Sequence, residues 1–463
     1  MIDKQAINAS FYSKLEEVCS RCTMQIDESH LETYGKDISN DEQYAFSYLA
    51  KPINEVEVSG ILRLCNEYNI PVTPHGGGSG LTGGANPVNG GLVLSMEKMD
   101  AIIEIDQVNK TAIVESGAIT QIFCEAVEEK GLFFPVQPGS SSMSLVGGNV
   151  ATNAGSMSSL KYGSIIDYVL NLQVVLANGE IIWTGANTSK SSTGPNVTKL
   201  MVGSEGTLGV ITKIVFKLIP KPLFTVTLQV NFESDEGLCQ AVNEIAISAL
   251  QAVEMELVDG NSVSMTSEFL ASKSSDFPIS SKPELLLTFN GNNEENVDRQ
   301  LEKCFEIVTK HSDNEVRVAK SHDEKMNVWK TRLNIGEALK HGGRTYRDID
   351  CAVPVSKLQD YLQFVNEVSS EYKVPIFCFG HAGNGNLHTM MSLEGNEEME
   401  SKALAEIYRK GIELGGTISG EHGIGNLQKS FMKDQFGEAY LHLLRGIKQA
   451  FDPNGIMNPG KIY

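Results

Sequence analysis

Three glycine-rich runs within residues 74–209 constrain this chain more than any other feature of its sequence. They are Pro74-His-Gly-Gly-Gly-Ser-Gly-Leu-Thr-Gly-Gly84, Pro138-Gly-Ser-Ser-Ser-Met-Ser-Leu-Val-Gly-Gly-Asn-Val-Ala-Thr-Asn-Ala-Gly155 and Gly203-Ser-Glu-Gly-Thr-Leu-Gly209. Glycine exposes backbone N–H groups without a side chain in the way, and successive N–H groups of this kind suit a pyrophosphate. The small residues of the second run allow a flat group to lie against the backbone. A merely flexible loop is disfavoured, because flexibility needs no small residue at so many fixed places.

The first run contains Gly78-Ser-Gly80-Leu-Thr-Gly83, which matches the glycine pattern of the dinucleotide-binding βαβ fold. That fold requires a helix directly after the pattern. Gly84 and Pro87 follow at once and would interrupt such a helix. The βαβ interpretation therefore fails on its context, and the glycines are expected to serve a different fold.

The charge balance excludes several classes of partner. The chain has 463 residues and a formal net charge of −20, a field that repels phosphate backbones and anionic lipid. We therefore expect no nucleic-acid partner and at most peripheral membrane contact. The N-terminus lacks the apolar core of a secretory signal, and no stretch approaches the roughly 20 apolar residues of a membrane span. The only close cysteine pair, Cys19 and Cys22, has no second pair to complete a thiolate metal site. A cytoplasmic protein is expected.

The periodicity of the apolar residues predicts an α+β chain with a boundary at Pro220-Lys-Pro222. Before it we expect helices at 54–69, with Asn54 as its cap, and 119–130, and strands at 70–73, 92–95, 101–106, 111–115, 168–177, 180–184 and 210–218. After it we expect strands at 224–232, 253–258, 284–290 and 315–321, helices at 236–250, 294–310, 323–340 and 354–372, and a hairpin around 376–392. The order strand, helix, strand, strand, helix, strand fits a ferredoxin-like unit.

Two glycine-framed segments carry histidines and a carboxylate near the C-terminus. Gly380-His-Ala-Gly-Asn-Gly-Asn-Leu-His388 places His381 and His388 seven residues apart across a turn. A hairpin can bring both rings to one point, unlike the helical pair of zinc proteases. Glu421 and His422 lie in Ser419-Gly-Glu-His-Gly-Ile-Gly425. The alternative is that each histidine is a satisfied core residue, which is disfavoured for a set framed by so many glycines.

These motifs together resemble one family, the FAD-linked D-2-hydroxyacid dehydrogenases of the vanillyl-alcohol-oxidase superfamily, which act on D-lactate, glycolate or D-2-hydroxyglutarate. The resemblance spans about residues 45–463 and rests on PHGGGSGLTGGA, PGSSSMSLVGGNVATNAGS, GSEGTLGVIT, GHAGNGNLH, SGEHGIG and FDPNGIMNPGK. It implies an FAD-binding domain over 1–220, a ferredoxin-like substrate or cap domain over 221–415, and a segment over 416–463 that completes the FAD and active sites.

The resemblance implies that the first run cradles the FAD pyrophosphate, the second lines the ribityl chain and isoalloxazine, and the third completes the slot. The residues expected to contact FAD are Pro74, Gly76, Gly77, Gly78, Ser79, Gly80, Leu81, Pro138, Gly139, Gly147, Gly148, Thr152, Ala154, Gly155, Glu205, Val210, Ile211 and Asn458. His75 stands where relatives more often carry Arg or Gln. The superfamily's covalent histidine usually falls later in that loop, so non-covalent FAD is expected.

The same resemblance assigns the polar residues. His381, His388 and Glu421 match the ligands of a divalent metal, with zinc first and manganese or iron as alternatives, and His422 matches the catalytic base. Three ligands leave coordination positions open for a substrate hydroxyl and carboxylate. His422 would take the hydroxyl proton while the C2 hydride passes to flavin. Asn386 joins the catalytic set.

The substrate carboxylate needs a cation. Trp329-Lys-Thr-Arg332 matches the family's WxxR segment, so Arg332 is the first choice, and Arg347 is a second candidate that could equally be a solvated surface residue. Met390 follows His388 by two residues and should face the same side of a strand. A thioether there favours an apolar substrate end, so D-lactate is expected ahead of D-2-hydroxyglutarate unless Arg347 or Arg344 reaches a distal carboxylate.

Other functions remain open at this point. Glycolate or D-2-hydroxyglutarate could be the substrate. A non-catalytic flavoprotein subunit that passes electrons would have no need of the histidines, and a metal hydrolase would have no need of the glycine runs. The electron acceptor, expected to differ from NAD, could be a quinone, a cytochrome or an electron-transferring flavoprotein, and a homodimer is left open.

Overall fold

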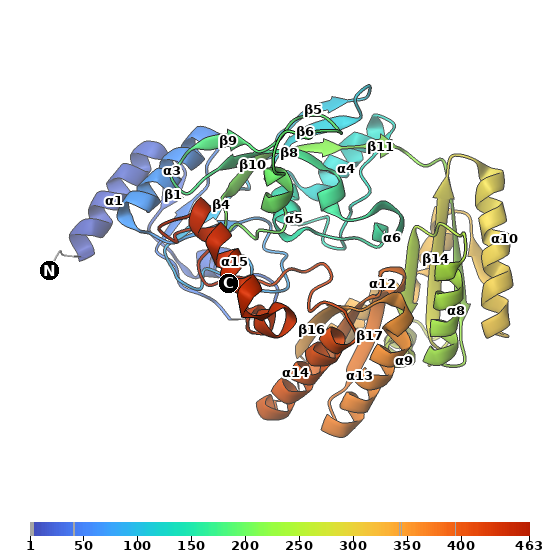
Figure 1. Cartoon of the computed structure of the whole chain (residues 1–463). Helices are drawn as coiled ribbons and strands as arrows, with labels where there is room; N and C mark the ends of the chain where they lie inside the picture. The colour runs from blue at the N-terminus through green and yellow to red at the C-terminus, as the bar shows by residue number, and fades with distance from the viewer. Residues whose placement is uncertain (1–3, 40–41, 342, 344, 394) are drawn as a thin grey trace. The chain divides into compact units, whose positions relative to one another are not determined.

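The computed structural model describes residues 4–39, 42–341, 343, 345–393 and 395–463. The chain divides into two compact units, each described by itself (Figure 1). The first unit contains Met1–Ser156, Ser164–Lys221 and Glu421–Tyr463, and the second contains Met157–Gly163 and Pro222–Gly420. The main division thus falls between Lys221 and Pro222, and the segment from Glu421 onward packs into the first unit.

The first sheet of the first unit leads into the first glycine run. Its order is β1 (Cys22–Thr23), β2 (Tyr48–Ala50), β4 (Leu92–Ser95) and β3 (Val72–His75), and β2, β4 and β3 are parallel. The predicted helix at 54–69 is α3 (Glu55–Tyr68). It begins at Asn54, whose side chain accepts from the N–H groups of Val56 and Glu57. Its apolar side packs against the sheet that contains β3. Strand β3 leads directly into the first glycine run.

The second sheet of the first unit is antiparallel throughout, in the order β5 (Ile102–Asp106), β6 (Thr111–Glu115), β10 (Val210–Lys217), β8 (Val169–Val175) and β9 (Ile181–Trp183). These strands lie at the predicted places. Strand β10 begins directly after the third glycine run. The remaining elements of this unit are α1 (Lys4–Val18), α2 (Glu28–Tyr34), α4 (Thr120–Glu129), β7 (Leu132–Phe133), α5 (Val146–Thr152), α7 (Val197–Met201), β11 (Ile219–Pro220) and α15 (Met432–Phe451).

Helix α15 and the residues after it close the first unit, and the sequence analysis did not foresee the helix. The chain beyond α15 returns to β3, where Met457 bridges Val72 and the Asn458 N–H donates to the Val72 carbonyl at 2.7 Å. The final Asn-Pro-Gly motif therefore lies beside the strand that carries the first glycine run.

The second unit is built on one antiparallel sheet of seven strands, in the order β15-β12-β14-β13-β17-β18-β16. Its first four strands with α8 and α10 confirm the predicted ferredoxin-like unit, because β15 and β14 flank β12, and β14 separates β12 from β13. The bounds are β12 (Phe224–Asn231), α8 (Asp235–Ile247), β13 (Glu254–Val258), β14 (Glu284–Gly291), α10 (Glu294–His311), β15 (Arg317–Ala319), β16 (Thr345–Ala352), β17 (Ile376–His381) and β18 (Asn386–Leu393).

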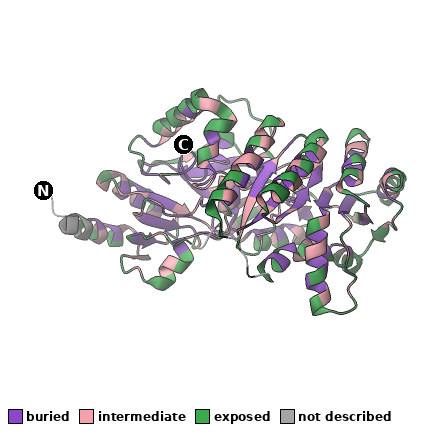
Figure 2. Cartoon of the chain, turned by 90° about the horizontal axis from the view of Figure 1, so that it is seen from below, coloured by how far each residue is buried: buried purple, intermediate pink, exposed green. Residues whose placement is uncertain are grey.

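Helices cover both faces of this sheet, and strand residues are the most buried part of the chain (Figure 2). Helices α9 (Gly260–Lys273) and α12 (Lys330–His341) pack on the face that carries Phe379, and α13 (Leu358–Tyr372) and α14 (Glu397–Glu413) pack on the other. The single helix expected over 323–340 is instead two, α11 (His322–Val328) and α12, which break at Trp329. Trp329 is buried in one apolar cluster with Leu286, Ala319 and Val328. Helix α6 (Ser159–Tyr162) also belongs to this unit.

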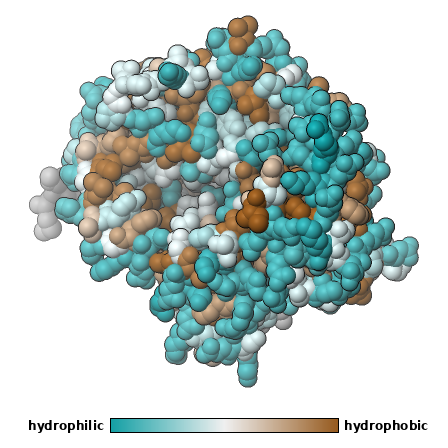
Figure 3. All heavy atoms as spheres, turned by 45° about the vertical axis from the view of Figure 1, so that its right-hand side comes forward, coloured by the Kyte–Doolittle hydropathy of each residue, from teal (hydrophilic) through white to brown (hydrophobic). Residues whose placement is uncertain are grey.

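Hydrophobic side chains on the surface occur in small groups among hydrophilic ones on the face shown in Figure 3. None of the helices in the described parts of the chain is both long enough and apolar enough to cross a bilayer.

Candidate functional site

The first two glycine runs pack backbone against backbone in the first unit. A Cβ on Gly76 would lie 3.6 Å from the Gly148 Cα, and one on Gly77 would collide with the carbonyl oxygen of Met143. A Cβ on Gly147 would come within 2.5 Å of the Ser116 Cβ. Close approach of the chain to itself therefore requires glycine at 77 and 147, whereas a Cβ on Gly76 would make only an ordinary contact. The structure brings the first and second runs together, as a shared slot requires.

Other positions in the runs face open space or carry unsatisfied polar atoms. No atom of the described residues would lie within 4 Å of a Cβ on Gly139 or Gly148. Three polar atoms near these runs are buried and have no hydrogen-bond partner among the described residues: His75 Nε2, Ser116 Oγ and Ser204 Oγ. Buried polar atoms are normally satisfied. The combination fits a polar ligand that lies on bare backbone, which is the character of FAD.

His75 lies at the end of β3, below the glycine turn. Its Nδ1 is 2.9 Å from the Gly76 carbonyl oxygen, and its ring meets the ring of Tyr34 edge to face at 5.4 Å. Burial lowers the pKa of His75, so the ring is neutral at neutral pH. A neutral, buried imidazole packs under the loop, and the non-covalent nature of the flavin stays a prediction.

Glu205, expected to contact the cofactor, holds the loop after His422, and its contact with FAD stays a prediction. Its carboxylate accepts hydrogen bonds from the N–H groups of Ile424 and Gly425, each at 2.7 Å, and burial raises its pKa to about 7. The Asn458 side-chain amide donates to the Glu205 carbonyl at 2.7 Å and to the Gly84 carbonyl at 3.0 Å. Through these hydrogen bonds, Glu205 and Asn458 connect the first glycine run, the third glycine run and the loop at 424–425.

The remaining residues expected to contact FAD belong to the three runs or adjoin them in the chain, and their contact with FAD stays a prediction. A Cβ on Gly206 would lie 3.0 Å from Pro74 Cγ, which places the third run beside the start of the first. Thr152, Ala154 and Gly155 follow or end α5, Val210 and Ile211 begin β10, Pro138 precedes Gly139, and Ser79, Gly80 and Leu81 continue the first run after Gly78.

Two buried ionisable residues near the first run were missed from the sequence. Asp37 lies 3.0 Å from the position of a Cβ on Gly80, and burial raises its pKa. The Lys461 ammonium donates to the Asn86 carbonyl at 2.5 Å, and burial lowers its pKa to about 8. Lys461 belongs to the final motif and could have been noticed there. Asp37 lies in a stretch with no motif at all.

Glu421 and His422 lie side by side in the first unit. His422 Nε2 is 3.6 Å from a carboxylate oxygen of Glu421, and the Thr82 hydroxyl donates to the His422 carbonyl at 3.2 Å. Together with the two hydrogen bonds from Ile424 and Gly425 to Glu205, this contact holds the loop from His422 to Gly425.

His381 and His388 come together in the second unit, as their spacing predicts. Strands β17 and β18 are antiparallel, with Phe379 opposite His388 and His381 opposite Asn386. Both rings lie on the face of the sheet that Phe379 occupies, with ring centroids 5.4 Å apart. A hairpin therefore presents two imidazoles at one place.

Glu256 of β13 stands opposite His381 and was missed from the sequence. One carboxylate oxygen is hydrogen-bonded to His381 Nδ1, and the other accepts from Nε and Nη2 of Arg332, each at 2.9 Å. Burial opposes ionisation of Glu256, but His381 and Arg332 outweigh it and lower its pKa to about 2. The Arg332 guanidinium also lies over the Phe379 ring at 4.8 Å. Arg332 is thus beside the histidines, with one edge already paired.

A pair of carboxylates lies on β16, beside His388. His388 Nδ1 is 3.7 Å from an oxygen of Asp348 and 4.0 Å from one of Asp350. Asp350 also accepts from the side-chain amide of Asn386 at 2.8 Å and from the Gly420 N–H at 3.0 Å. Asn386 therefore positions Asp350 in this structure.

The register of β16 against β18 decides the face on which Arg347 lies, and its catalytic role stays a prediction. Arg347 pairs with Met391, one residue out of step with Asp348 and Asp350, so its side chain lies on the opposite face from His388. Helices α13 and α14 cover that face. Met390 does share the face of His388, but it packs against the apolar cluster of Ile335 and Leu339. Arg344 lies outside the described residues.

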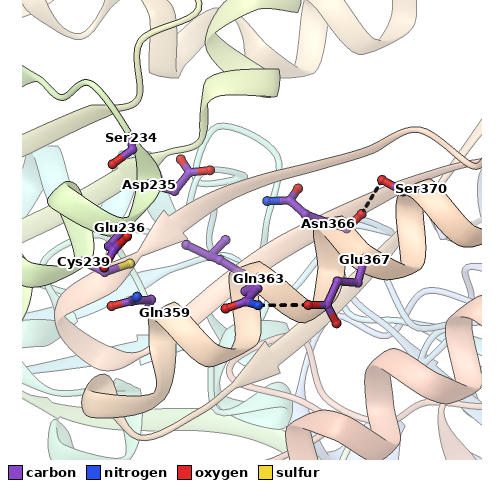
Figure 4. Close-up of a pocket in the computed structure, with 10 residues that line it drawn as sticks. Ser234, Asp235, Glu236, Cys239, Gln359, Gln363, Asn366, Glu367 and Ser370 are labelled. Carbon is purple, nitrogen blue, oxygen red and sulfur yellow. Dashed lines mark hydrogen bonds between the residues drawn. The ribbon is translucent and has the colours of Figure 1, made fainter.

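An open groove of about 660 Å³ in the second unit lies apart from these residues, between α8 and α13 (Figure 4). Two of its hydrogen bonds lie within α13: the Gln363 amide donates to Glu367 at 3.0 Å, and the Ser370 hydroxyl donates to the Asn366 carbonyl at 2.9 Å. None of the predicted site residues lines it.

Comparison with known proteins gives consistent matches over most of the chain. Residues 46–185 match the FAD binding domain family, and residues 221–462 match the C-terminal domain of the FAD linked oxidases. Among curated proteins, the chain is 37% identical to "Glycolate oxidase subunit GlcD" of Bacillus subtilis, covering 93% of this chain and 92% of that one. It is 34% identical to "D-lactate dehydrogenase" of Anaerostipes hadrus, covering 98% of each.

Solved structures support the fold. The chain is 18% identical to 4-ethylphenol oxidase from Gulosibacter chungangensis, with a TM-score of 0.79 over 99% of this chain and 97% of that one. It is 17% identical to p-cresol methylhydroxylase, with a TM-score of 0.77 and the same coverage.

Proposed function

The chain belongs to the FAD-linked D-2-hydroxyacid dehydrogenases of the vanillyl-alcohol-oxidase superfamily, and from this premise we propose that it oxidises D-lactate to the 2-oxoacid with the help of a divalent metal. It is an FAD-linked oxidoreductase of the D-lactate and glycolate dehydrogenase type. The proposal concerns the substrate, the metal and the roles of the residues. In it the first unit binds FAD and the second binds the substrate.

The observation that carries the proposal is the hairpin of His381 and His388, with Glu256 on His381. A carboxylate on the far nitrogen of a histidine is the usual partner of a metal-ligating imidazole. In the proposal His381, His388 and Glu421 hold the metal, with zinc first. When bound, FAD supplies the hydride acceptor and the metal supplies a Lewis acid for the substrate oxygens.

The chain's own residues supply binding and proton transfer. His422 accepts the proton of the C2 hydroxyl as the hydride leaves C2, so that the C–O bond becomes a carbonyl. An imidazole suits this role, since its pKa lies close to neutral pH. Arg332 uses Nε and Nη2 for Glu256, which leaves the edge with Nη1 for the substrate carboxylate. Asn386 steadies Asp350 beside His388.

The names of the relatives suggest two candidate substrates, glycolate and D-lactate. Met390 lies on the face of His388 and near the apolar residues of α12. These apolar surroundings favour a substrate whose end opposite the reacting carboxylate carries no second charge. Burying a methyl group there gains about 0.8 kcal/mol, whereas burying an unpaired carboxylate costs several times more. D-lactate therefore stands ahead of D-2-hydroxyglutarate, with glycolate as the second candidate. The electron acceptor in this proposal is a quinone, a cytochrome or an electron-transferring flavoprotein.

The test is an anaerobic substrate panel with zinc-loaded, FAD-containing protein, followed by the bleaching of the flavin absorbance. D-Lactate should bleach it with the highest kcat/KM, glycolate more slowly, and L-lactate and D-2-hydroxyglutarate poorly. Chelation should stop bleaching and leave FAD bound. A preference for D-2-hydroxyglutarate would overturn the assignment of D-lactate as the substrate. Full activity of metal-free protein would remove the metal from the mechanism.

A further inference from the structure

We propose that Glu256 is a positioning residue for the reaction: it holds the His381 ring so that Nε2 is the nitrogen offered to the metal, and it is itself held by Arg332. The inference deepens the proposed function and rests on it. It concerns a residue that carries no recognisable motif and lies 125 positions before His381 in the chain.

The two oxygens of Glu256 have separate tasks. One meets His381 Nδ1, and the other receives both Nε and Nη2 of Arg332 at 2.9 Å. An ionised carboxylate can only accept hydrogen bonds. Because this hydrogen bond occupies Nδ1, Nε2 is the nitrogen of His381 that is left to face a metal. Because Glu256 is fully buried between two fixed partners, the ring has one orientation.

A purely structural role explains this arrangement less well. Burying an ion pair costs desolvation of both charges, and a well-packed apolar pair often serves a fold equally well. The same strand shows the ordinary alternative two residues away, where Glu254 pairs with Lys325 at 3.0 Å and both side chains retain some exposure. Of these two glutamates, Glu256 is the fully buried one, and it is the one whose carboxylate also contacts a histidine.

The geometry also links the two predicted tasks of the site. Arg332 stacks over Phe379, and the Phe379 ring lies 5.4 Å from the His388 ring. Glu256 and Phe379 therefore hold Arg332 from two sides while each contacts one histidine. A change at Glu256 should disturb metal binding first and carboxylate binding second.

The experiment compares Glu256→Gln with the matched control Glu254→Gln in FAD-containing protein. Zinc affinity is measured by competition with a chromogenic chelator, together with bound FAD and thermal unfolding. Loss of a hydrogen-bond partner behind a ligand typically weakens metal binding about 10- to 100-fold. We expect that loss in Glu256→Gln, with unchanged FAD content, and wild-type zinc affinity in Glu254→Gln.

A second comparison tests whether Glu256 acts through His381. In a His381→Ala background, adding Glu256→Gln should change zinc affinity no further, because the ring that it holds is gone. Steady-state kinetics should show a fall in kcat that zinc saturation restores in part, together with a smaller rise in KM. A structural role would lower the unfolding temperature and leave the zinc affinity of the folded fraction unchanged.

The outcomes separate the inference from the proposed function. Wild-type zinc affinity in folded Glu256→Gln overturns the inference and leaves the proposed function intact. Failure of the wild-type protein to bind zinc, with full activity, overturns both. If Glu256→Gln does not fold, Glu256→Asp keeps the charge but is one methylene shorter and cannot reach both partners. Folded Glu256→Asp with wild-type zinc affinity would equally refute the inference.

Discussion

Replacing Gly148 by alanine should separate the folding of the first unit from its contact with FAD. Gly148 lies inside α5, and a Cβ there would find no atom of the described residues within 4 Å. Glycine inside a helix is less favourable than alanine by about 0.5–1 kcal/mol. We therefore expect the free energy of unfolding of Gly148→Ala apoprotein to rise by about that amount.

The effect on FAD binding should have the opposite sign. If the flavin lies against the Gly148 backbone, as we propose, the new methyl group enters a close contact. An extra methyl group in a well-packed contact costs about 1–3 kcal/mol. At 1.4 kcal/mol for each factor of ten, FAD should bind roughly 5- to 150-fold more weakly.

The assay is urea unfolding of the apoprotein together with a fluorescence titration with FAD. Gly446→Ala is the control, because Gly446 is an exposed helical glycine of α15 whose Cβ would also meet nothing within 4 Å. It should show the gain in stability without the loss of affinity. Gly147→Ala should lose stability, since its Cβ would lie 2.5 Å from the Ser116 Cβ. Wild-type FAD affinity in Gly148→Ala would refute the placement of the flavin.

Three further outcomes are expected. His422→Ala should slow single-turnover flavin reduction by D-lactate roughly 10²- to 10⁴-fold in stopped flow, and a wild-type rate would place the base elsewhere. Burial raises the pKa of Glu284 from 4.5 to about 7, so the folded state holds this proton up to a higher pH than the unfolded chain does, and the free energy of unfolding of the wild type falls as pH rises through that window. Glu284→Gln should remove this loss of about 3 kcal/mol between about pH 4 and pH 9 in urea unfolding. Parallel pH profiles of the two proteins would contradict this. Acid precipitation should release FAD into the supernatant, whereas flavin in the pellet would show a covalent bond and point to His75.

Much of the fold follows from signals that lie within a few residues of one another. The Asn54 cap and the apolar side of α3 are local, and so is the alternation of strands and helices that predicts the ferredoxin-like unit. Helices α9, α14 and α15 were not foreseen. The break at Trp329 was also missed, because the apolar periodicity continues through it; in the structure α11 ends at Trp329, which is buried in a cluster with Leu286.

Two features could be predicted from the sequence alone: where this protein needs backbone without side chains, and where two imidazoles meet. Both depend on short segments, because the first needs only the lack of a Cβ and the second only the spacing across one hairpin. The sequence could not determine which carboxylate His381 would meet, since Glu256 is joined to it only by the register of β13 against β17. Nor could it tell that Glu205 would hold the loop after His422, 219 residues away. The face of Arg347 depended likewise on strand register, where one residue decides between the two sides of a sheet. Contacts between distant segments are set by how sheets and loops assemble, and that assembly exists only in the tertiary structure.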